Sequence, residues 1–189
     1  MQQNHSRFIL IVGVVFGLFL DINLSMASGK KFETFDPERV KTWSFFSDGV
    51  MGGVSIGKAL LKKSGQDNFV RIEGKVSTEN NGGFIQIRHN LTKPLEESIK
   101  GIRLKVRGNG ENYYIFIRTR STLLPWQFYS LEFPTSKKWS IVELEFNKFG
   151  RSSSFLRKTF KSSSIKSVGV VAYGRDHSAK LDVSEIDFF

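Results

Sequence analysis

The chain has 189 residues, a length that accommodates one domain with a single hydrophobic core and leaves little room for a second. Hydrophobic residues make up 40% of it and include 18 phenylalanines, so the sequence predicts a packed interior and excludes intrinsic disorder. It has no cysteine, which excludes disulfides, thiol catalysis and cysteine-ligated zinc, and its net charge of +10 raises the question of an anionic partner.

The first 27 residues differ in composition from the rest of the chain. Arg7 precedes an uncharged run, Phe8 to Leu20, and the small residues Ser25 and Ala27 match the pattern of a cleavage site. This run is shorter than the roughly 20 residues that a helix needs to span a bilayer. Residues 1–27 are therefore predicted to be a signal peptide of an exported protein, periplasmic or secreted. The alternative is an uncleaved N-terminal segment that anchors the protein to a membrane.

From about residue 40 the chain consists of short runs in which apolar and polar residues alternate. Val70 and Ile72, for example, alternate with Arg71 and Glu73, which is the pattern of a half-buried antiparallel strand. The predicted strands are residues 43–46, 54–61, 68–76, 84–89, 101–108, 113–119, 126–133, 139–146, 167–173 and 181–188. Because no long helix accompanies them, we expect an all-β fold, an antiparallel β-sandwich or jelly roll. Residues 150–164 lack the strand pattern and are predicted to form a surface loop.

Positive charge is concentrated in the segment 148–175. Its basic residues, with no acid among them, are Lys148, Arg151, Arg157, Lys158, Lys161, Lys166 and Arg175. The segment is either a solvated basic face or a surface that attracts an anionic partner. Nucleic acid is the usual partner of such a basic protein, but it is not expected for an exported one.

Residues for catalysis or metal binding do not form a convincing set. His89 and His177 lack partners at the spacing of metal ligands. The tripeptide Asp176–Ser178 contains the residue types of a catalytic triad, but neighbours on an extended chain point to opposite faces, so we expect a polar turn. Acids such as Glu73 and Glu143 lie among outward-facing charges and make a weak case for a hydrolase. We expect no enzyme activity, no cofactor and no metal ion.

Longer strings of residues connect these elements to a known family. The glycine-rich stretch reads WSFFSDGVMGGVSIGKA, residues 43–59. It is followed in order by FVRIEGKVSTENNGGFIQIR, GIRLKVRGNGENYYIFIRT and KKWSIVELEFNKF. In these strings the sequence resembles the complex I intermediate-associated protein 30 family over residues 35–188. Asn109 departs from the pattern, because the family usually has Asp there.

The resemblance implies a galactose-binding-like β-sandwich without enzyme activity. Mitochondrial members of the family assist the assembly of respiratory complex I on the matrix side and stay with incomplete membrane-arm intermediates. The resemblance therefore implies an assembly-factor or chaperone-like protein that acts through protein partners, membrane-associated ones included. An exported relative would face the other side of the membrane. The alternative function is an extracytoplasmic carbohydrate-binding module, which would use aromatic residues such as Trp126, Phe128 and Tyr129 to hold a glycan.

The glycine-rich stretch itself supports two interpretations. In the first it is a corner of the fold, where Gly49, Gly52 and Gly53 adopt backbone angles closed to other residues and Asp48 caps a turn. In the second it is part of a binding site at the rim of the sandwich. The candidate ligand-facing residues are then Asp48, Met51, Gly52, Gly53 and Ser55.

A second candidate surface comes from the alternation in two central strands. Phe84 and Arg88 share one face of their strand, and Tyr114 and Arg118 share one face of theirs. Aromatic and arginine side chains together are typical of recognition surfaces, so we expect these four residues to contribute to a protein- or glycan-binding face. The alternative is that loops bury this face and that the arginines pair with acids.

Overall fold

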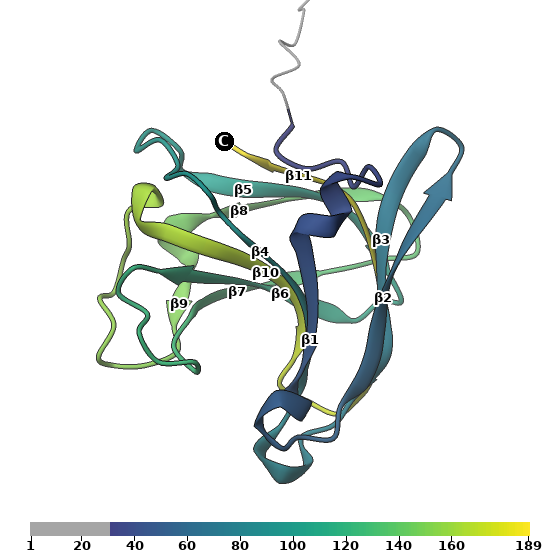
Figure 1. Ribbon diagram of the computed structural model, residues 1–189, viewed down its shortest axis with the longest axis horizontal. Coiled ribbons are helices and arrows are strands. Elements are labelled where there is room, and N and C mark those ends of the chain that lie inside the picture. Colours follow the sequence, from purple (N-terminus) through teal and green to yellow (C-terminus); the bar gives the residue numbers. More distant parts are fainter. Residues whose placement is uncertain (1–30) are drawn as a thin grey trace, which may run out of the picture.

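The computed structural model describes residues 31–189, and the predicted signal peptide, residues 1–27, lies outside them. Over the described residues the chain forms two antiparallel β-sheets that face each other (Figure 1). The predicted all-β antiparallel sandwich is therefore confirmed. No helix between residues 31 and 189 has the length and apolar character that a membrane crossing requires.

One sheet has six strands and the other has five. The six-stranded sheet consists, in spatial order, of β1 (Trp43–Ser47), β4 (Phe84–Asn90), β10 (Ile165–Tyr173), β6 (Asn112–Thr119), β7 (Tyr129–Pro134) and β9 (Gly150–Arg151). The five-stranded sheet consists of β2 (Ile56–Ser64), β3 (Asp67–Val76), β11 (His177–Phe188), β5 (Gly101–Gly108) and β8 (Ser140–Glu145). Short 3₁₀ turns connect them: η1 (Arg39–Thr42), η2 (Asp48–Met51), η3 (Glu79–Asn81), η4 (Phe146–Lys148) and η5 (Ser162–Ser164).

The core lies between the sheets and is filled by alternate residues of the strands. Ile85 and Ile87 of β4 are buried in it, as are Ile115 and Ile117 of β6. Because side chains alternate along a strand, the residues between them point away from the other sheet. The outer face of the six-stranded sheet therefore carries a separate set of side chains.

The bounds of some strands differ from the prediction. The strand predicted over 126–133 begins at Tyr129, because Phe128 N donates to Ser152 Oγ and not to a neighbouring strand. The last strand begins at His177, so the tripeptide Asp176–Ser178 is only partly the polar turn that we expected. Residues 150–164 do form a loop, but they include β9 and a buried side chain, Leu156.

Candidate binding site

The glycine-rich stretch is organised around one buried carboxylate. Asp48, at the start of η2, is fully buried, and its carboxylate accepts four hydrogen bonds. Ser55 donates from its backbone N at 2.9 Å and from its Oγ at 2.5 Å, and the backbone N atoms of Gly83 and Phe84 donate at 2.5 and 3.3 Å. The carboxylate therefore joins η2 to the start of β4. In Figure 1 the dark blue turn after β1 lies beside the teal turn before β4.

This bonding pattern decides the charge state of Asp48. Burial on its own would raise the pKa of the carboxyl group, but the hydrogen bonds from Ser55, Gly83 and Phe84 outweigh it and lower the pKa below its usual value. The carboxylate is thus ionised and enclosed by donors of its own chain. Asp48 and Ser55, which the sequence offered as ligand-facing residues, have their side chains buried against each other and hold the loop instead.

Two glycines of the stretch have different reasons to be glycine. Gly52 ends η2 with φ of 88°, a left-handed conformation that side chains disfavour. Gly49 and Gly53 do not have a positive φ, so the expectation that they need glycine-only backbone angles is wrong. A Cβ on Gly53 would overlap the carboxylate of Asp48, so this position requires glycine for lack of space.

A groove of about 570 Å³ lies on the outer face of the six-stranded sheet. Its floor is formed by side chains of β1, β4, β6 and β10, and its rims by η2 and the loop before β7. Its lining includes Phe46, Val50, Met51, Phe84, Gln86, Arg88, Phe116, Arg118, Trp126, Phe128, Ser167, Gly169 and Tyr173. The structure thus brings together the candidates Phe84, Arg88 and Arg118, and adds Met51 and Gly82 from the two turns at its end.

Aromatic rings form much of the groove wall. Phe116 and Phe128 stack with their centroids 3.9 Å apart and an interplanar angle of 11°, and Tyr173 meets both edge-on. Trp126 lies on the rim with 61% of its surface exposed. Phe116 and Tyr173 were not among the predicted site residues. Phe116 could have been predicted, because the alternation along its strand places it on the same face as Arg118. Tyr173 could not, because its place in the groove depends on the pairing of β10 with β4, which sets Tyr173 opposite Phe84.

The two arginines of the groove do not pair with acids within residues 31–189. The guanidinium of Arg88 lies over the ring of Phe46, 4.4 Å from its centroid. Arg118 donates from Nη2 to the backbone carbonyls of Thr122 and Leu124 at 3.3 and 3.0 Å. Burial, and then the charge of Arg118, lower the pKa of Arg88 from its usual value. The alternative that acids neutralise both arginines does not hold.

Tyr114 lies apart from these residues, although it shares their strand face. Its ring meets Phe116 and Tyr173 edge-on, and its Oη donates to Glu132 Oε1 at 3.0 Å. Burial, followed by the hydrogen bond to Glu132, raises its pKa. Tyr114 therefore supports the aromatic wall from behind and does not line the groove. Of the aromatic residues considered for glycan binding, Trp126 and Phe128 line the groove, whereas Tyr129 is buried in the core.

The chain matches the model of a known protein family. The family model described as complex I intermediate-associated protein 30 (CIA30) matches residues 32–183. The chain belongs to the CIA30 family. The resemblance inferred from the glycine-rich stretch is thereby confirmed. No curated protein sequence gives a significant match to this chain.

Solved structures with the same fold are carbohydrate-binding domains and a domain of a larger enzyme. The family 11 carbohydrate-binding module of the cellulase Lic26A-Cel5E of Clostridium thermocellum superposes with a TM-score of 0.69 at 14% identity, over 85% of this chain and 93% of the module. A family 11 module from the same organism, in complex with a β-1,3-1,4-mixed-linked tetrasaccharide, gives a TM-score of 0.70 at 15% identity, over 85% and 94%. An exo-β-agarase superposes with a TM-score of 0.58 at 8% identity, over 85% of this chain and 25% of the agarase chain. At these identities the likeness establishes the galactose-binding-like jelly-roll fold of the CIA30 protein and nothing more.

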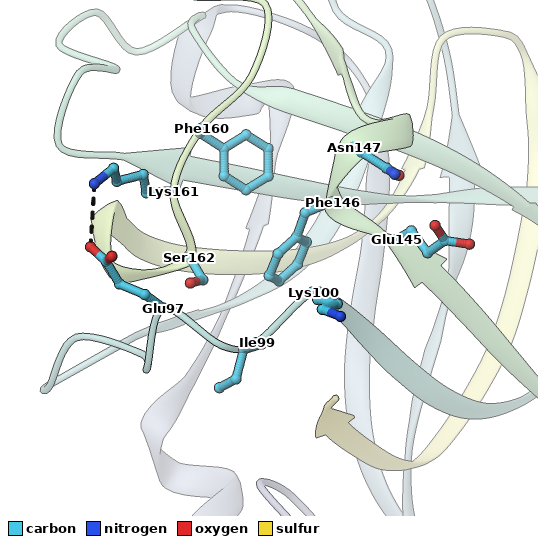
Figure 2. A pocket seen from close by; sticks show the side chains of 9 residues that line it. All are labelled: Glu97, Ile99, Lys100, Glu145, Phe146, Asn147, Phe160, Lys161 and Ser162. Atoms are coloured by element: carbon cyan, nitrogen blue, oxygen red, sulfur yellow. Dashed lines mark hydrogen bonds and ion pairs between the residues drawn. The ribbon is translucent and has the colours of Figure 1, made fainter.

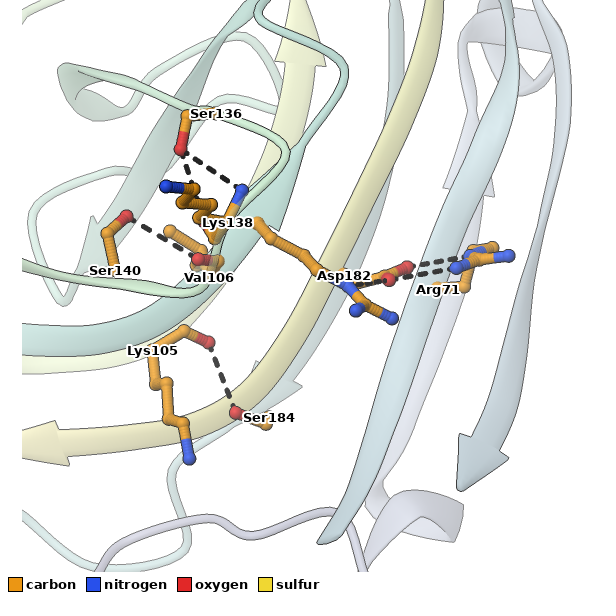
Figure 3. Close-up of polar contacts among 9 residues, drawn as sticks. Arg71, Lys105, Val106, Ser136, Lys138, Ser140, Asp182 and Ser184 are labelled. Atoms are coloured by element: carbon orange, nitrogen blue, oxygen red, sulfur yellow. Dashed lines mark hydrogen bonds and ion pairs between the residues drawn. The ribbon is translucent and has the colours of Figure 1, made fainter. Parts of the chain in front are cut away.

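Other hollows of the CIA30 protein are smaller or carry charges that are already paired. Figure 2 shows one of about 310 Å³, in which Lys161 Nζ lies 3.5 Å from Glu97 Oε1. On the five-stranded sheet, Figure 3 shows Asp182 bound to Arg71 through two hydrogen bonds of 2.7 and 2.8 Å, and Arg107 donates to the same carboxylate at 2.7 Å. The first is a pair between two loops and the second a cross-strand cluster, and each is satisfied within the protein without a ligand.

The remaining polar candidates do not assemble a reactive centre. No three acids or histidines between residues 31 and 189 converge as a metal ion would require. Asp176 accepts from the backbone and hydroxyl of Thr78, and His177 Nδ1 lies 2.8 Å from the carbonyl of Arg175, so the tripeptide forms no relay. Three cations of the basic segment form ion pairs: Lys148 with Glu145, Lys161 with Glu97, and Arg175 with Glu111. Attraction of the segment 148–175 to an anionic surface stays a prediction.

Proposed function

We propose that this CIA30 protein is a non-catalytic, assembly-factor-like binding protein that holds a segment of a partner protein in the groove. The observation that carries the proposal is the apolar rim. Val50 and Met51 of η2 are 71% and 56% exposed, and Leu123 and Trp126 on the opposite side are 78% and 61% exposed. All four line the groove or the smaller hollow that adjoins it.

Exposed apolar side chains gathered around one concave surface are typical of protein interaction sites. Methionine and tryptophan are enriched in such interfaces, because the flexible thioether chain adapts to irregular surfaces and the indole ring gives a large rigid contact. Inside the rim, the stacked rings of Phe116 and Phe128 offer an apolar wall, and Gln86 and Arg88 offer hydrogen bonds. A polypeptide segment has both the apolar side chains and the polar backbone that such a groove accommodates.

A glycan is the second candidate, because flat aromatic rings stack on the apolar faces of sugars and Trp126 and Phe128 both border the groove. The fold shared with carbohydrate-binding modules agrees with this candidate. The aliphatic side chains of Val50 and Met51 weigh against it, since they supply neither a flat ring nor a hydrogen bond.

The partner is proposed to lie outside the cytoplasm, since residues 1–27 have the sequence of an export signal. The family's link to complex I assembly supports a protein partner.

The proposal is tested by selecting random dodecapeptides, displayed on phage, against the immobilised protein. Met51→Glu places a charge on the apolar rim, and Ile141→Glu is the matched control, since Ile141 is 66% exposed on β8 of the other sheet. We expect selected peptides to bind the wild-type protein and Ile141→Glu alike and to bind Met51→Glu about tenfold more weakly or not at all. Failure to select any peptide would contradict the proposal, as would equal loss in both variants. Binding of a mixed-linked β-glucan tetrasaccharide in place of peptides would favour the glycan.

A further inference from the structure

We infer that the partner segment carries an acidic side chain, and that its carboxylate is bound between Arg88 and Arg118 at one end of the groove. This inference rests on the proposed function and specifies the chemistry of the ligand. Both arginines line the groove and also the smaller adjoining hollow of about 270 Å³, where Lys166 joins them. Three cationic side chains thus border one end of the site.

The sheet register leaves an open space between the arginines. β10 lies between β4 and β6, with Gly169 opposite Arg88 on one side and Ser167 opposite Arg118 on the other. Glycine and serine are both small, so β10 fills little of the space beside the arginines. A Cβ on Gly169 would already lie 2.9 Å from Gln86 Oε1. The space that both arginines line therefore lies over small residues of the central strand β10.

No acid between residues 31 and 189 lines this space. Neither hollow has an aspartate or glutamate in its lining. Within residues 31–189 the side chain of Arg88 makes no hydrogen bond, and the side chain of Arg118 donates only from Nη2. Several N–H donors of the two guanidinium groups are thus left for a ligand, and guanidinium groups bind carboxylates through paired hydrogen bonds.

Arginines on the other sheet are neutralised by the protein itself. Asp182 binds Arg71 and Arg107, and Glu143 binds Arg103. The groove is the place where two neighbouring strand arginines lack such a partner among the described residues. Burial of Arg88 and its repulsion by Arg118 lower the pKa of its side chain, and the negative charge of a bound carboxylate would offset both effects.

The occupant is inferred to be an acidic peptide because charge and apolar surface adjoin each other. A short segment could place a carboxylate between the arginines while its neighbouring apolar side chains contact Met51 and Trp126 on the rims. An inorganic anion or a sulfated sugar would satisfy the arginines but would leave the aliphatic rim uncovered.

The experiment uses a fluorescently labelled peptide from the phage selection and a second version in which every Asp and Glu is replaced by Asn and Gln. Fluorescence anisotropy compares their affinities for the wild-type protein, Arg88→Gln, Arg118→Gln and the control Arg103→Gln, which changes an arginine of the five-stranded sheet. We expect the neutral peptide to bind the wild-type protein about 10- to 100-fold more weakly, as the loss of a charge-assisted hydrogen bond predicts. The two groove variants should lose this preference and the control should keep it.

The outcomes distinguish failure of carboxylate binding by the arginines from failure of peptide binding in the groove. Equal affinity of the acidic and neutral peptides for the wild-type protein would overturn the inference and leave peptide binding intact. Retention of the preference by both groove variants would also overturn it, because the carboxylate would then bind elsewhere. If one groove variant does not fold, the other still shows whether the preference for the acidic peptide depends on this pair of arginines. A selection that yields no peptide would overturn the proposed function itself.

Discussion

At the scale of single residues, Asp48 illustrates how a buried carboxylate can fix the shape of a loop. It sits among donors that come from Ser55, Gly83 and Phe84, so its interactions span a large separation along the chain. Two of these donors are backbone N–H groups of the turn before β4, and a buried N–H without an acceptor is costly. The position of Met51 at the rim of the groove therefore depends on a residue that is itself buried beneath the loop.

Asp48→Asn is predicted to lower the free energy of unfolding at pH 7 by about 2–3 kcal/mol, since hydrogen bonds to a charged acceptor are stronger than those to a neutral amide. The pKa of Asp48 is lower in the folded than in the unfolded chain. Its contribution is therefore present above the unfolded value of about 3.9 and is lost as the pH falls through the folded value. Urea denaturation at pH 7 and pH 3 measures this, and the difference between variant and wild type should shrink at pH 3. A stability difference between variant and wild type that is the same at both pH values would contradict a stabilising role of the ionised Asp48 carboxylate.

The glycines of the same loop give a second prediction. Gly52→Ala is expected to cost about 1 kcal/mol, because φ of 88° is unfavourable for alanine while the space around it is open. Gly53→Ala is expected to cost about 3 kcal/mol, because its Cβ would displace the carboxylate of Asp48. Thermal or urea denaturation of both variants shows which substitution lowers the stability more. Equal losses, or a larger loss at Gly52, would be incompatible with this explanation.

At the scale of strands, the outer face of the five-stranded sheet is held by cross-strand ion pairs. Asp182 of β11 lies between Arg71 of β3 and Arg107 of β5, so one carboxylate joins three adjacent strands. The guanidinium of Arg107 also lies over the rings of Phe69 and Trp139. Burial would raise the pKa of Asp182, but the bonds from the two arginines lower it. The cluster stabilises the sheet that backs the groove-bearing one.

Asp182→Asn should therefore lower the free energy of unfolding at pH 7 by about 2 kcal/mol, because it leaves two partly buried arginines without a counter-charge. The matched control is Glu143→Gln, which removes the exposed pair with Arg103 and should cost less than about 0.5 kcal/mol. Urea denaturation of both variants compares the two sites. A loss at Glu143 as large as that at Asp182 would show that burial does not govern these pairs.

The sequence predicted the strands and part of the groove because period-two alternation is a local signal. Phe84, Arg88 and Arg118 could be assigned to one surface, since alternation sends them to the face opposite the apolar core residues. The separation of Tyr114 from that surface could not be predicted, because it depends on β7 pairing with β6 and bringing Glu132 opposite. The hydrogen bonds of Asp48 could not be predicted either, because the alternation of side chains does not show which turns lie next to each other.

At the scale of the whole molecule, the β-sandwich follows an N-terminal segment that is predicted to be removed. Residues 1–27 have the apolar run and small residues of an export signal, so the mature protein should begin near Ser28. N-terminal sequencing of the protein from its native cell, after fractionation, measures this. Intact Met1 in a cytoplasmic fraction would contradict the predicted export and would direct the search for a partner to the cytoplasmic side.

The central claim, that the groove of the six-stranded sheet is the binding surface, can be tested with the three tryptophans of the chain. Trp126 lies on the groove rim, Trp43 is in the core with Nε1 bonded to Glu33, and Trp139 packs against Phe69 beside the other sheet. Their indole N–H resonances in a ¹⁵N-labelled sample report three separate regions. Titration with a selected peptide should shift the Trp126 resonance and leave those of Trp43 and Trp139 in place. A shift of Trp139 with Trp126 unchanged would place binding on the opposite sheet and contradict the account.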